Sequence, residues 1–580
     1  MDMFIKQFGE KDLTSLIIYK TPYQARKLKL STMEAKDKLN LLRILRGTLI
    51  FLPVFLFLLS SCYPLTVTTG KWRIRWDKEM KKGKETFLES SKPALNDRPP
   101  NIVILMADDL GKYEVSAYGV DHISTPNIDR IGHEGVIFDD AYVTAPTCAP
   151  SRAGILTGRV QNRYGFETQI MEIYPTNMIE YLSGKYFVKT GSFVMEAKPH
   201  FPSEYQVQKQ GLPPTEINLA EALKTLNYTN GLVGKWHLGI SRNHVPLNRG
   251  FDYQYGFYGA SSLYTAERNW SHIINYEHQS FSAQHQWNTE RYGEAAILEM
   301  GKEILEEEYL TYAFRDKAMA FIEKNKEDPF FLYCTFSAPH IPFQAPVDYY
   351  CMYDHVEDEN KRVYYAMISA LDDAIGEIHQ KIKDLGLEEN TIIYLLSDNG
   401  GASYTKATDN GPLKGGKLNQ FEGGIRVPFM MKWPAKIPAG IRYEYPVSSA
   451  DIFVTSFINA GGTLPQDREY DGVDLIPFVL GENQDRPHEN FFWRADHIWA
   501  IRDGDYKLIL STRDGWAELY DLKKDISESY NLKEEMPDLY EKLYLLHQQW
   551  QKDNLPEKPM WPRIMDKKFV IDGKEYLFPA

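Results

Sequence analysis

The feature that most constrains the fold is a set of short apolar runs without polar interruptions. They are I-V-I-L-M at 102–106, F-F-L-Y-C-T-F at 330–336 and I-I-Y-L-L at 392–396. A strand with one face in water would alternate apolar and polar residues. These runs therefore indicate strands buried on both faces of a parallel sheet. Helical periodicity at 217–226 and 364–385 fits the crossover connections that parallel strands need. The predicted fold class is therefore α/β, with a large mixed, mostly parallel sheet sandwiched by helices.

Two of these predicted strands are followed by oxygen-bearing side chains. Asp108 and Asp109 come after the first run. Asp398 and Asn399 come after the third. The carboxyl ends of parallel strands meet at one edge of a sheet, where open α/β folds place their sites. Adjacent carboxylates repel each other unless a cation lies between them, and a hard divalent cation takes oxygen ligands. An exposed acidic turn would explain the first pair alone, but the second pair favours a metal site.

A third signal is the segment C-A-P-S-R-A-G-I-L-T-G-R at 148–159. Pro150 suits the first turn of a helix, so we expect Cys148 just before a helix N-terminus. Free backbone N–H groups and the helix dipole favour an anion there. The simpler interpretation of a lone cysteine is a buried core thiol. Cys334, inside an apolar run, is interpreted in that way, and the sequence leaves open whether it pairs with Cys351.

These segments resemble one known family. Residues 148–159 are similar to the C-x-P-S-R-x-x-x-L-T-G-R signature of the type I sulfatases, which depend on formylglycine and belong to the alkaline-phosphatase-like superfamily. The family's G-K-W-H-L-G motif is matched at 234–239, and its lysine-containing E-G-G-x-R-V-P segment at 417–428. The resemblance covers about residues 98–555. It implies that a maturase oxidises Cys148 to formylglycine, whose hydrate is the nucleophile.

The resemblance also assigns residues to one Ca²⁺ and to the sulfate ester. The implied metal ligands are Asp108, Asp109, Asp398, Asn399 and modified Cys148. The implied catalytic residues are Cys148, Arg152, Lys235, His237, His340 and Lys417. The two lysines would neutralise sulfate oxygens, while His237 and Arg152 would bind and orient the hydrate. His340 would protonate the departing alcohol, because a histidine pKa near neutrality suits a general acid. Asp398 is a reasonable base.

Two nearby polar segments are interpreted as having no role in the site. Asp409-Asn410-Gly411 repeats the letters of the second metal pair but follows no strand, so it is predicted to be a turn. Lys414 is predicted to be solvated.

The N-terminal region is predicted to carry an export signal. Residues 47–60 form an apolar run of signal-peptide length behind several lysines and arginines. Leu59-Ser60-Ser61-Cys62 resembles a bacterial lipobox, which implies cleavage before Cys62 and lipidation of that cysteine. The expected location is the bacterial cell envelope, as an exported lipoprotein held by acyl chains. A plain secretory signal is an alternative, and a spanning helix is disfavoured by Pro53.

The predicted domain organisation follows from these segments. Residues 1–62 are predicted to be the signal and lipobox segment, and 1–32 are interpreted as an over-extended start before Met33. Residues 63–97 are polar and are interpreted as a tether. The catalytic domain is predicted over 98–485. Residues 486–580 are expected to form a C-terminal α+β subdomain and tail, with a small antiparallel sheet and a helix.

The function implied by the resemblance is hydrolysis of sulfate esters, with O-sulfate on a carbohydrate as the expected substrate. The expected partners are that sulfated glycan, the maturase and a membrane contacted only through the lipid anchor. A net charge of −13 argues against nucleic acid. Two alternatives remain open. One is a phosphonate or phosphate monoester hydrolase of the same superfamily, and the other is an inactive glycan-binding surface lipoprotein.

Overall fold

The computed structural model describes most of the chain from residue 74 onward. The described residues are 74–90, 98–170, 181–182, 185–186, 193–195, 203–265, 273–276, 291–563 and 565–580. Almost all of them belong to one compact unit, which is formed by Trp72–Ile173, Thr190–Glu196 and Ser203–Ala580. The predicted signal run at 47–60 and the predicted lipidation site Cys62 lie outside the described residues. Among the helices that the structure describes, none combines the length and apolarity needed to cross a membrane.

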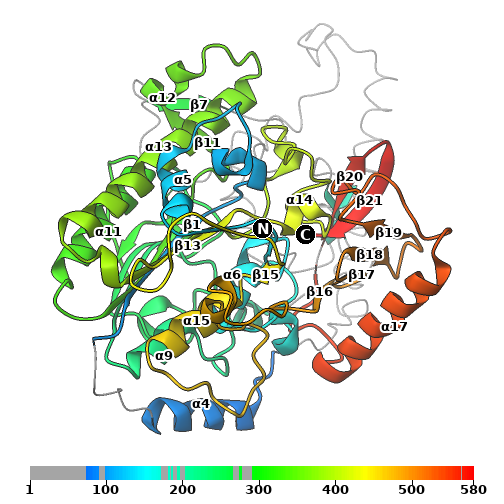
Figure 1. Ribbon diagram of the computed structural model, residues 1–580, viewed down its shortest axis with the longest axis horizontal. Helices are drawn as coiled ribbons and strands as arrows, with labels where there is room; N and C mark the ends of the chain where they lie inside the picture. Colours follow the sequence, from blue (N-terminus) through cyan, green and yellow to red (C-terminus); the bar gives the residue numbers. More distant parts are fainter. Residues whose placement is uncertain are drawn as a thin grey trace, which may run out of the picture. The chain divides into compact units, whose positions relative to one another are not determined.

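A ten-stranded sheet forms the centre of the larger unit (Figure 1). Its strands are β1 (Asn101–Ala107), β2 (Val136–Phe138), β5 (Thr229–Lys235), β6 (Tyr253–Phe257), β8 (Leu298–Glu299), β9 (Lys302–Glu303), β10 (Phe330–Thr335), β12 (Thr391–Ser397), β13 (Phe429–Lys432) and β14 (Ile441–Tyr443). The order is β14-β2-β13-β12-β1-β10-β5-β6-β8-β9. The neighbours β12, β1, β10, β5 and β6 run parallel, whereas β13 and β8 pair antiparallel to them. The three apolar runs are thus adjacent central strands, and the predicted fold class is confirmed.

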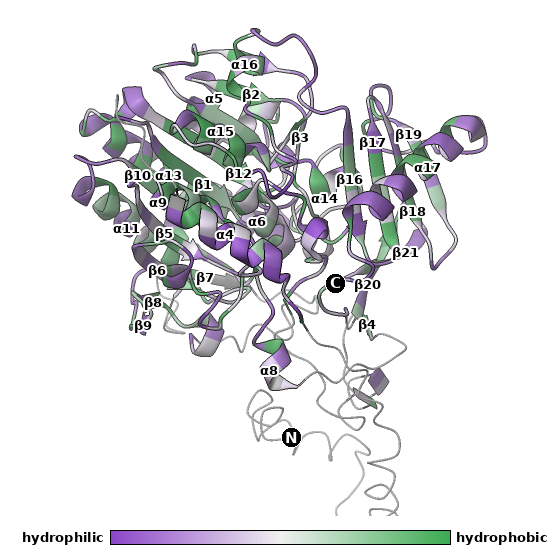
Figure 2. Ribbon diagram, turned by 90° about the horizontal axis from the view of Figure 1, so that it is seen from below, coloured by the Kyte–Doolittle hydropathy of each residue, from purple (hydrophilic) through white to green (hydrophobic). Residues whose placement is uncertain are grey.

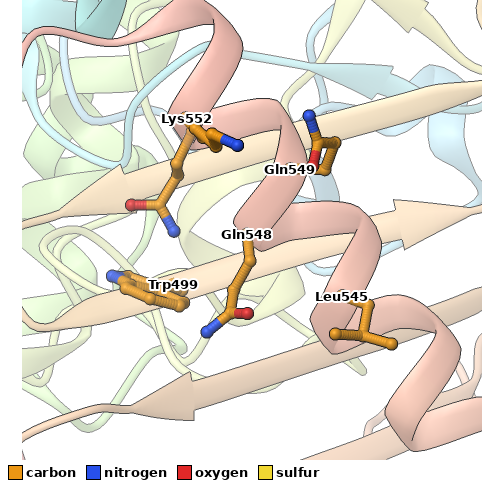
Figure 3. A pocket seen from close by; sticks show the side chains of 6 residues that line it. Trp499, Leu545, Gln548, Gln549 and Lys552 are labelled. Atoms are coloured by element: carbon orange, nitrogen blue, oxygen red, sulfur yellow. The ribbon is translucent and has the colours of Figure 1, made fainter.

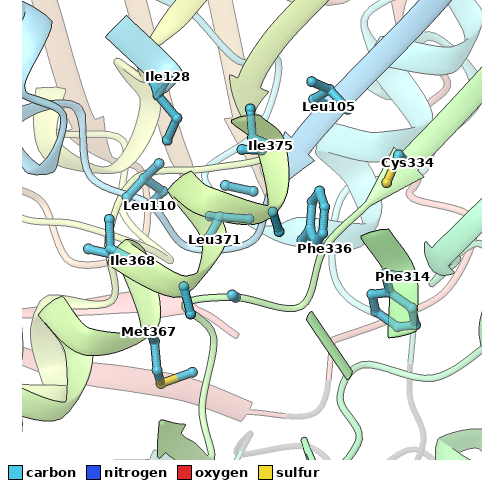
Figure 4. Packing of buried hydrophobic residues seen from close by; sticks show 14 of the residues in the cluster. Leu105, Leu110, Ile128, Phe314, Cys334, Phe336, Met367, Ile368, Leu371 and Ile375 are labelled. Atoms are coloured by element: carbon cyan, nitrogen blue, oxygen red, sulfur yellow. The ribbon is translucent and has the colours of Figure 1, made fainter. Parts of the chain in front are cut away.

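Helices cover both faces of this sheet. On one face lie α5 (Pro126–His133), α11 (Leu310–Lys324) and α13 (Glu359–Asp384), and on the other lie α6 (Cys148–Thr157), α9 (Leu219–Lys224) and α15 (Asp451–Asn459). Strand β1 serves both layers, because Val103 and Leu105 pack into one apolar cluster and Ile104 into the other. Figure 4 shows the first cluster, in which Leu371 of α13 lies near the strands. Burial on both faces explains why the central strands are continuously hydrophobic (Figure 2).

The C-terminal part forms a separate antiparallel sheet with one helix. Its strands are β16 (Asn490–Ala495), β17 (Ile498–Asp503), β18 (Tyr506–Ser511) and β19 (Ala517–Asp521), followed by α17 (Pro537–Asn554). One face of the sheet packs against α17, and the other packs against Phe421 and Ile425 of the catalytic part. This arrangement agrees with the antiparallel sheet and helix expected there.

Shorter elements complete the fold. They are β3 (Ala141–Tyr142), β4 (Phe193–Met195), β7 (Ile273–Tyr276), α8 (Glu204–Val207), β11 (Phe343–Pro346), α12 (Val347–Met352), α14 (Glu422–Ile425), β15 (Val447–Ser448) and α16 (Ile476–Val479). Strand β3 pairs with β15, and β7 pairs with β11.

Two segments differ from the expected domain organisation. Part of the predicted tether forms α4 (Lys78–Ser90), because the Lys84 ammonium is buried against Glu221 Oε1 at 2.6 Å and anchors this helix to the folded unit. The predicted tail forms a hairpin of β20 (Met565–Ile571) and β21 (Lys574–Pro579), and β4 adds to its edge. Its Asp572-Gly573 turn is a hairpin signal that could have been read from the sequence.

Candidate active site

Cys148 lies at the N-terminus of α6, close to where the sequence placed it. It is the first residue of the helix and follows the N-cap Thr147. Gly158 ends the helix in the left-handed conformation, with φ 67°. Every residue of α6 is buried. The helix therefore presents its free N–H end, with Cys148, to an interior site rather than to bulk water.

The two predicted carboxylate pairs meet beside this cysteine. Because β1 and β12 are parallel neighbours, with Ala107 opposite Ser397, the residues after them lie side by side. The backbone N–H of Asp109 donates to Asp398 Oδ1 at 3.3 Å, and Asn399 Nδ2 donates to Asp109 Oδ1 at 2.7 Å. Cys148 Sγ is 3.5 Å from Asp108 Oδ1. The side chains predicted as metal ligands thus lie in one linked cluster, in which Asp108 and Asp109 are the two shown near Cys148 Sγ.

Three cations neutralise these carboxylates. Lys235 Nζ donates to Asp108 Oδ2 at 2.7 Å, and Lys417 Nζ lies 2.8 Å from Asp109 Oδ1. Arg152 Nε donates to Asp398 Oδ2 at 2.8 Å. Burial by itself would raise the pKa of Asp108, but the attraction of Lys235 and its neighbours holds that pKa well below its usual range. Burial and the Asp108 charge instead raise the pKa of Asp398 to about 6.

The two predicted histidines also reach the site. His340 Nε2 is 3.6 Å from Asp109 Oδ2. Burial and then Lys417 lower the pKa of His340 to about 4. His237 is buried two residues beyond Lys235 and has a positive φ of 56°. Burial and Lys235 lower the pKa of His237 well below its ordinary value, so both imidazoles are neutral in this arrangement.

The oxygen donors of the site, which are the Asp108, Asp109 and Asp398 carboxylates and the Asn399 amide oxygen, fit a hard divalent cation. Ligand atoms of Asp108, Asp109, Cys148 and His340 all lie within 4.8 Å of one another. Within the described part of the chain, the buried Asn399 Oδ1 has no hydrogen-bond partner, although Asn399 Nδ2 has two. A buried amide oxygen that accepts no hydrogen bond and lies among carboxylates is available to bind a metal ion, and oxygen ligands of this kind suit Ca²⁺.

Comparison with known proteins decides the family. A family model described as Sulfatase matches residues 100–462, more than half of the chain. The chain belongs to the sulfatase family. A second family model, described as N-sulphoglucosamine sulphohydrolase, C-terminal, matches residues 417–553. The family resemblance expected from the motifs is confirmed.

Individual relatives agree with this assignment. Arylsulfatase from Hemicentrotus pulcherrimus is 33% identical to this sulfatase over 427 residues, covering 71% of this chain and 68% of the relative. N-acetylgalactosamine-6-sulfatase from Homo sapiens is 32% identical over 418 residues, covering 71% of each chain. The solved structure of Ps i-CgsB in complex with k-i-k-neocarrahexaose has a TM-score of 0.66 and 29% identity, covering 80% of this chain and 95% of that one. The protein is a sulfatase enzyme with the fold of its family.

Several residues that sequence reasoning missed support the sulfatase site. Ser397 Oγ accepts from the Leu110 N–H at 2.9 Å and donates to the Asn399 carbonyl at 2.7 Å, so it joins the two carboxylate pairs. The Gln169 side chain accepts from the Ala149 N–H at 3.2 Å, at the free end of α6. No local pattern marks the link to Leu110, because Ser397 lies 287 positions away along the chain.

The interpretation of 409–411 as a turn also misses a supporting contact. The segment turns, since Asp409 Oδ1 accepts from the Gly411 N–H at 3.1 Å. However, Asn410 Oδ1 accepts from the Gly401 N–H at 2.8 Å, and Asn410 Nδ2 donates to the Gly415 carbonyl at 2.9 Å. Asn410 therefore ties the segment after Asn399 to the loop that carries Lys417.

The open question about the cysteines is decided. Cys334 and Cys351 are both free, so they do not pair. Cys334 is buried in the cluster of Figure 4, as expected of a core thiol, and Cys351 is exposed on α12.

A hollow of about 560 Å³ lies elsewhere in the sulfatase, between β17 and α17 (Figure 3). Its lining residues are Trp499, Leu545, Gln548, Gln549, Gln551 and Lys552. Trp499 is on the face of the C-terminal sheet that packs against α17. None of the predicted site residues lines this hollow. The candidate site is therefore assigned from the side chains that meet beside Cys148 and not from this hollow.

Proposed function

We propose that this sulfatase removes O-sulfate from a carbohydrate, using formylglycine made from Cys148 and one Ca²⁺ held by Asp108, Asp109, Asp398 and Asn399. The observation that carries the proposal is the convergence of two buried lysines on the carboxylates beside Cys148. Membership of the sulfatase family supports it.

The charge distribution suits a sulfate ester. Such an ester is anionic and repels nucleophiles, so catalysis needs positive charge arranged in advance. Lys235, Lys417 and Arg152 are buried at the site, where α6 begins. These three cations balance three carboxylates, Asp108, Asp109 and Asp398, one for one. A bound Ca²⁺ would make the site net positive and polarise a sulfate oxygen.

An unmodified thiol at residue 148 would be a poor nucleophile. Burial and the Asp398 charge raise the pKa of Cys148 to about 12, so the thiol would stay protonated at neutral pH. Formylglycine supplies, as its hydrate, a hydroxyl nucleophile and a second hydroxyl that allows release of the product. Arg152, fixed by Asp398 and by the Lys235 carbonyl at 2.9 Å, is placed to orient that group. The maturase is therefore a required partner in this proposal.

His340 has the geometry of a proton donor to the leaving alcohol. Its Nδ1 lies 2.5 Å from the Ile341 carbonyl oxygen, which can only accept, so Nδ1 carries a proton. The other nitrogen, Nε2, faces Asp109 and can donate only when the ring is charged. With its pKa at about 4, His340 is neutral at pH 7 in this arrangement. The negative charge of a bound sulfate ester would raise the pKa of His340 and so favour protonation of the ring.

A carbohydrate substrate is supported by two relatives. Ps i-CgsB is a solved structure in complex with k-i-k-neocarrahexaose, and the curated N-acetylgalactosamine-6-sulfatases bear a sugar in their name. The proposed location is the bacterial cell envelope, and its support is the lipobox-like Leu59–Cys62 segment.

The deciding experiment is peptide mass spectrometry of residue 148 in active protein. We expect the mass of formylglycine in place of cysteine; a fully active protein that retains the sulfur would end the proposed mechanism. Parallel assays on aryl sulfate and aryl phosphate test the alternative hydrolase, which faster phosphate turnover would favour. A panel of sulfated monosaccharides then identifies the substrate. Binding of these sugars without turnover by fully modified protein would support the inactive glycan-binding alternative.

A further inference from the structure

A buried charge cluster links the C-terminal sheet to the loop that carries Lys417. Lys507 on β18 lies between Glu422, the first residue of α14, and Glu528, which follows β19. Its Nζ is 2.8 Å from Glu422 Oε1 and 2.9 Å from Glu528 Oε1. All three side chains are 0% exposed. We call Glu422, Lys507 and Glu528 the interface cluster.

The interface cluster contacts the backbone of the loop as well as its side chains. The Glu422 N–H donates to Glu528 Oε2 at 2.7 Å. The second carboxylate oxygen of Glu422 accepts from the Tyr142 hydroxyl at 2.7 Å, on the short strand β3 that precedes Cys148. Glu422 is therefore held from the C-terminal sheet on one side and from the catalytic part on the other.

Lys414 forms a second attachment at the other end of the loop. Its Nζ donates to the Glu528 carbonyl at 3.1 Å and to the Tyr520 hydroxyl at 3.2 Å, and its side chain is 7% exposed. The prediction that Lys414 is solvated is therefore wrong, because the C-terminal sheet covers it. The Lys414 carbonyl also accepts from the Gly423 N–H at 2.8 Å, which ties the two ends of the loop together.

The loop between these attachments has little room to adjust on its own. A Cβ on Gly424 would lie 2.0 Å from the Asn419 carbonyl oxygen, so the backbone is packed against itself. The Lys417 N–H donates to the Gly401 carbonyl at 3.0 Å, and the Leu418 N–H donates to the Pro146 carbonyl at 2.8 Å. A displacement of the loop ends would therefore move the Lys417 ammonium relative to Cys148.

We propose that Lys507 and Glu528 are positioning residues that fix Lys417 for binding of the sulfate group. This inference rests on the proposed function, because it assumes that Lys417 binds sulfate. Neither residue touches the reacting atoms. Apolar contacts around Phe421 and Ile425 already hold the C-terminal sheet in place, and burying ions carries a large desolvation cost. The interface cluster adds what apolar contacts lack, a single defined position for the backbone at Glu422.

The test uses the full-length protein and a double variant, Lys507→Met with Glu528→Gln, which leaves the net charge of the protein unchanged. The matched control is Asn554→Ala, which removes a different contact with the catalytic part, the 2.6 Å bond to Arg163 Nη1. Two properties are measured for each protein. The first is the inhibition constant of inorganic sulfate, together with kcat and KM for an aryl sulfate. The second is the shift of the melting temperature caused by calcium chloride, whose proposed ligands follow β1 and β12.

We expect the double variant to weaken sulfate inhibition and raise KM by about tenfold, since a misplacement on the order of 1 Å can cost roughly a hundredfold in rate. Its calcium shift should not fall below that of the natural protein, because moving Lys417 away from Asp109 removes no calcium ligand. Asn554→Ala should change neither property. Unchanged sulfate inhibition would overturn the inference. So would a parallel loss of sulfate and calcium binding, which a merely structural role predicts.

If the double variant does not fold, Glu528→Gln alone is measured by the same two criteria, because it keeps the Lys507–Glu422 pair. The natural protein separates the two levels of the argument. Absence of both aryl sulfate turnover and sulfate inhibition in the natural protein would overturn the proposed function itself. Normal behaviour of the natural protein with no change in the variants would overturn only the positioning role.

Discussion

At the scale of single residues, the site is built from charges that are paired across long stretches of chain. Lys235 meets Asp108 across 127 positions, and Lys417 meets Asp109 across 308. Each pair is buried, so neither partner could be removed without leaving an uncompensated charge. The motifs identify these residues, but the pairing between them depends on how the strands are ordered.

A prediction at this scale concerns calcium. We expect calcium to raise the free energy of unfolding by about 2.7 kcal/mol when present at about one hundred times its dissociation constant. Asn399→Leu should lose most of this gain, because it removes the unpartnered Asn399 Oδ1. The control is Glu134→Gln, in a second group with metal-ligand spacing among the described residues, Glu134, His379 and Glu388. There the Lys432 ammonium already contacts both glutamates, so the calcium effect should persist. Equal calcium effects in Asn399→Leu and the natural protein would contradict the metal site.

A second prediction at this scale concerns the proton donor. His340→Asn should reduce the kcat for a sugar sulfate by roughly 10²–10⁴-fold, because a sugar alcohol needs a proton as it leaves. The same variant should lose much less activity on 4-nitrophenyl sulfate, whose leaving group departs without protonation. The measurement is the ratio of the two losses. Equal losses on both substrates would show that His340 has another role.

At the scale of elements, parallel pairing and helix ends place the groups. The register of β1 against β12 brings the ends of two strands together, and α6 directs its first residue at the same point. A side-chain contact joins the start of α15 to the segment just before β16. His488 Nε2 lies 2.9 Å from Oδ1 of Asp451, the first residue of α15, and Asp451 Oδ2 accepts from the Ser448 N–H at 2.7 Å.

This contact leads to a prediction about pH. Burial alone would lower the pKa of His488, but the Asp451 carboxylate raises it above the ordinary value of 6.5. The charged pair therefore stabilises the fold fully below about pH 6.5, and its contribution is lost as the pH rises through the folded-state pKa. His488→Gln should cost about 1.5–3 kcal/mol at pH 6 and progressively less toward pH 9. Chemical denaturation at each pH measures the difference, and a cost that does not change with pH would argue against a charged His488.

At the scale of the whole molecule, the larger unit joins two sheets that share one boundary. The face of the C-terminal sheet opposite α17 packs against Leu418, Phe421 and Ile425. The boundary also contains the interface cluster and Trp493, whose Nε1 donates to the Val143 carbonyl at 2.8 Å. The predicted catalytic domain, 98–485, therefore has an apolar face that is covered by residues beyond 485.

This boundary predicts how the molecule unfolds. A chain that ends at residue 485 should lack a cooperative, calcium-dependent melting transition, because it exposes Phe421 and Ile425 and leaves Glu422 without Lys507. The full-length protein should show a single transition for both sheets. Calorimetry and limited proteolysis measure both properties. A shortened chain that melts cooperatively and binds calcium would show that the catalytic part folds alone.

The sequence by itself predicted the central strands and named the residues that meet at the candidate site. Continuous apolar runs such as 102–106 can be satisfied only by burial on both faces, and short motifs keep Cys148 and Arg152 on one helix at a set spacing. Both are local properties, so they can be read without knowing the fold. The same reasoning missed α4 and the β20–β21 hairpin, whose stabilising partners lie elsewhere in the chain.

Only the tertiary structure decided which groups meet. The order of β12, β1, β10 and β5 brings Asp398, Asp108 and Lys235 to one edge, and nothing local specifies that order. The tertiary structure also shows that Lys414 is buried and that Lys507 reaches the Lys417 loop from another sheet. The physical reason is the same in each case: a buried charge is stabilised by partners distant in sequence, and packing of the whole chain selects those partners.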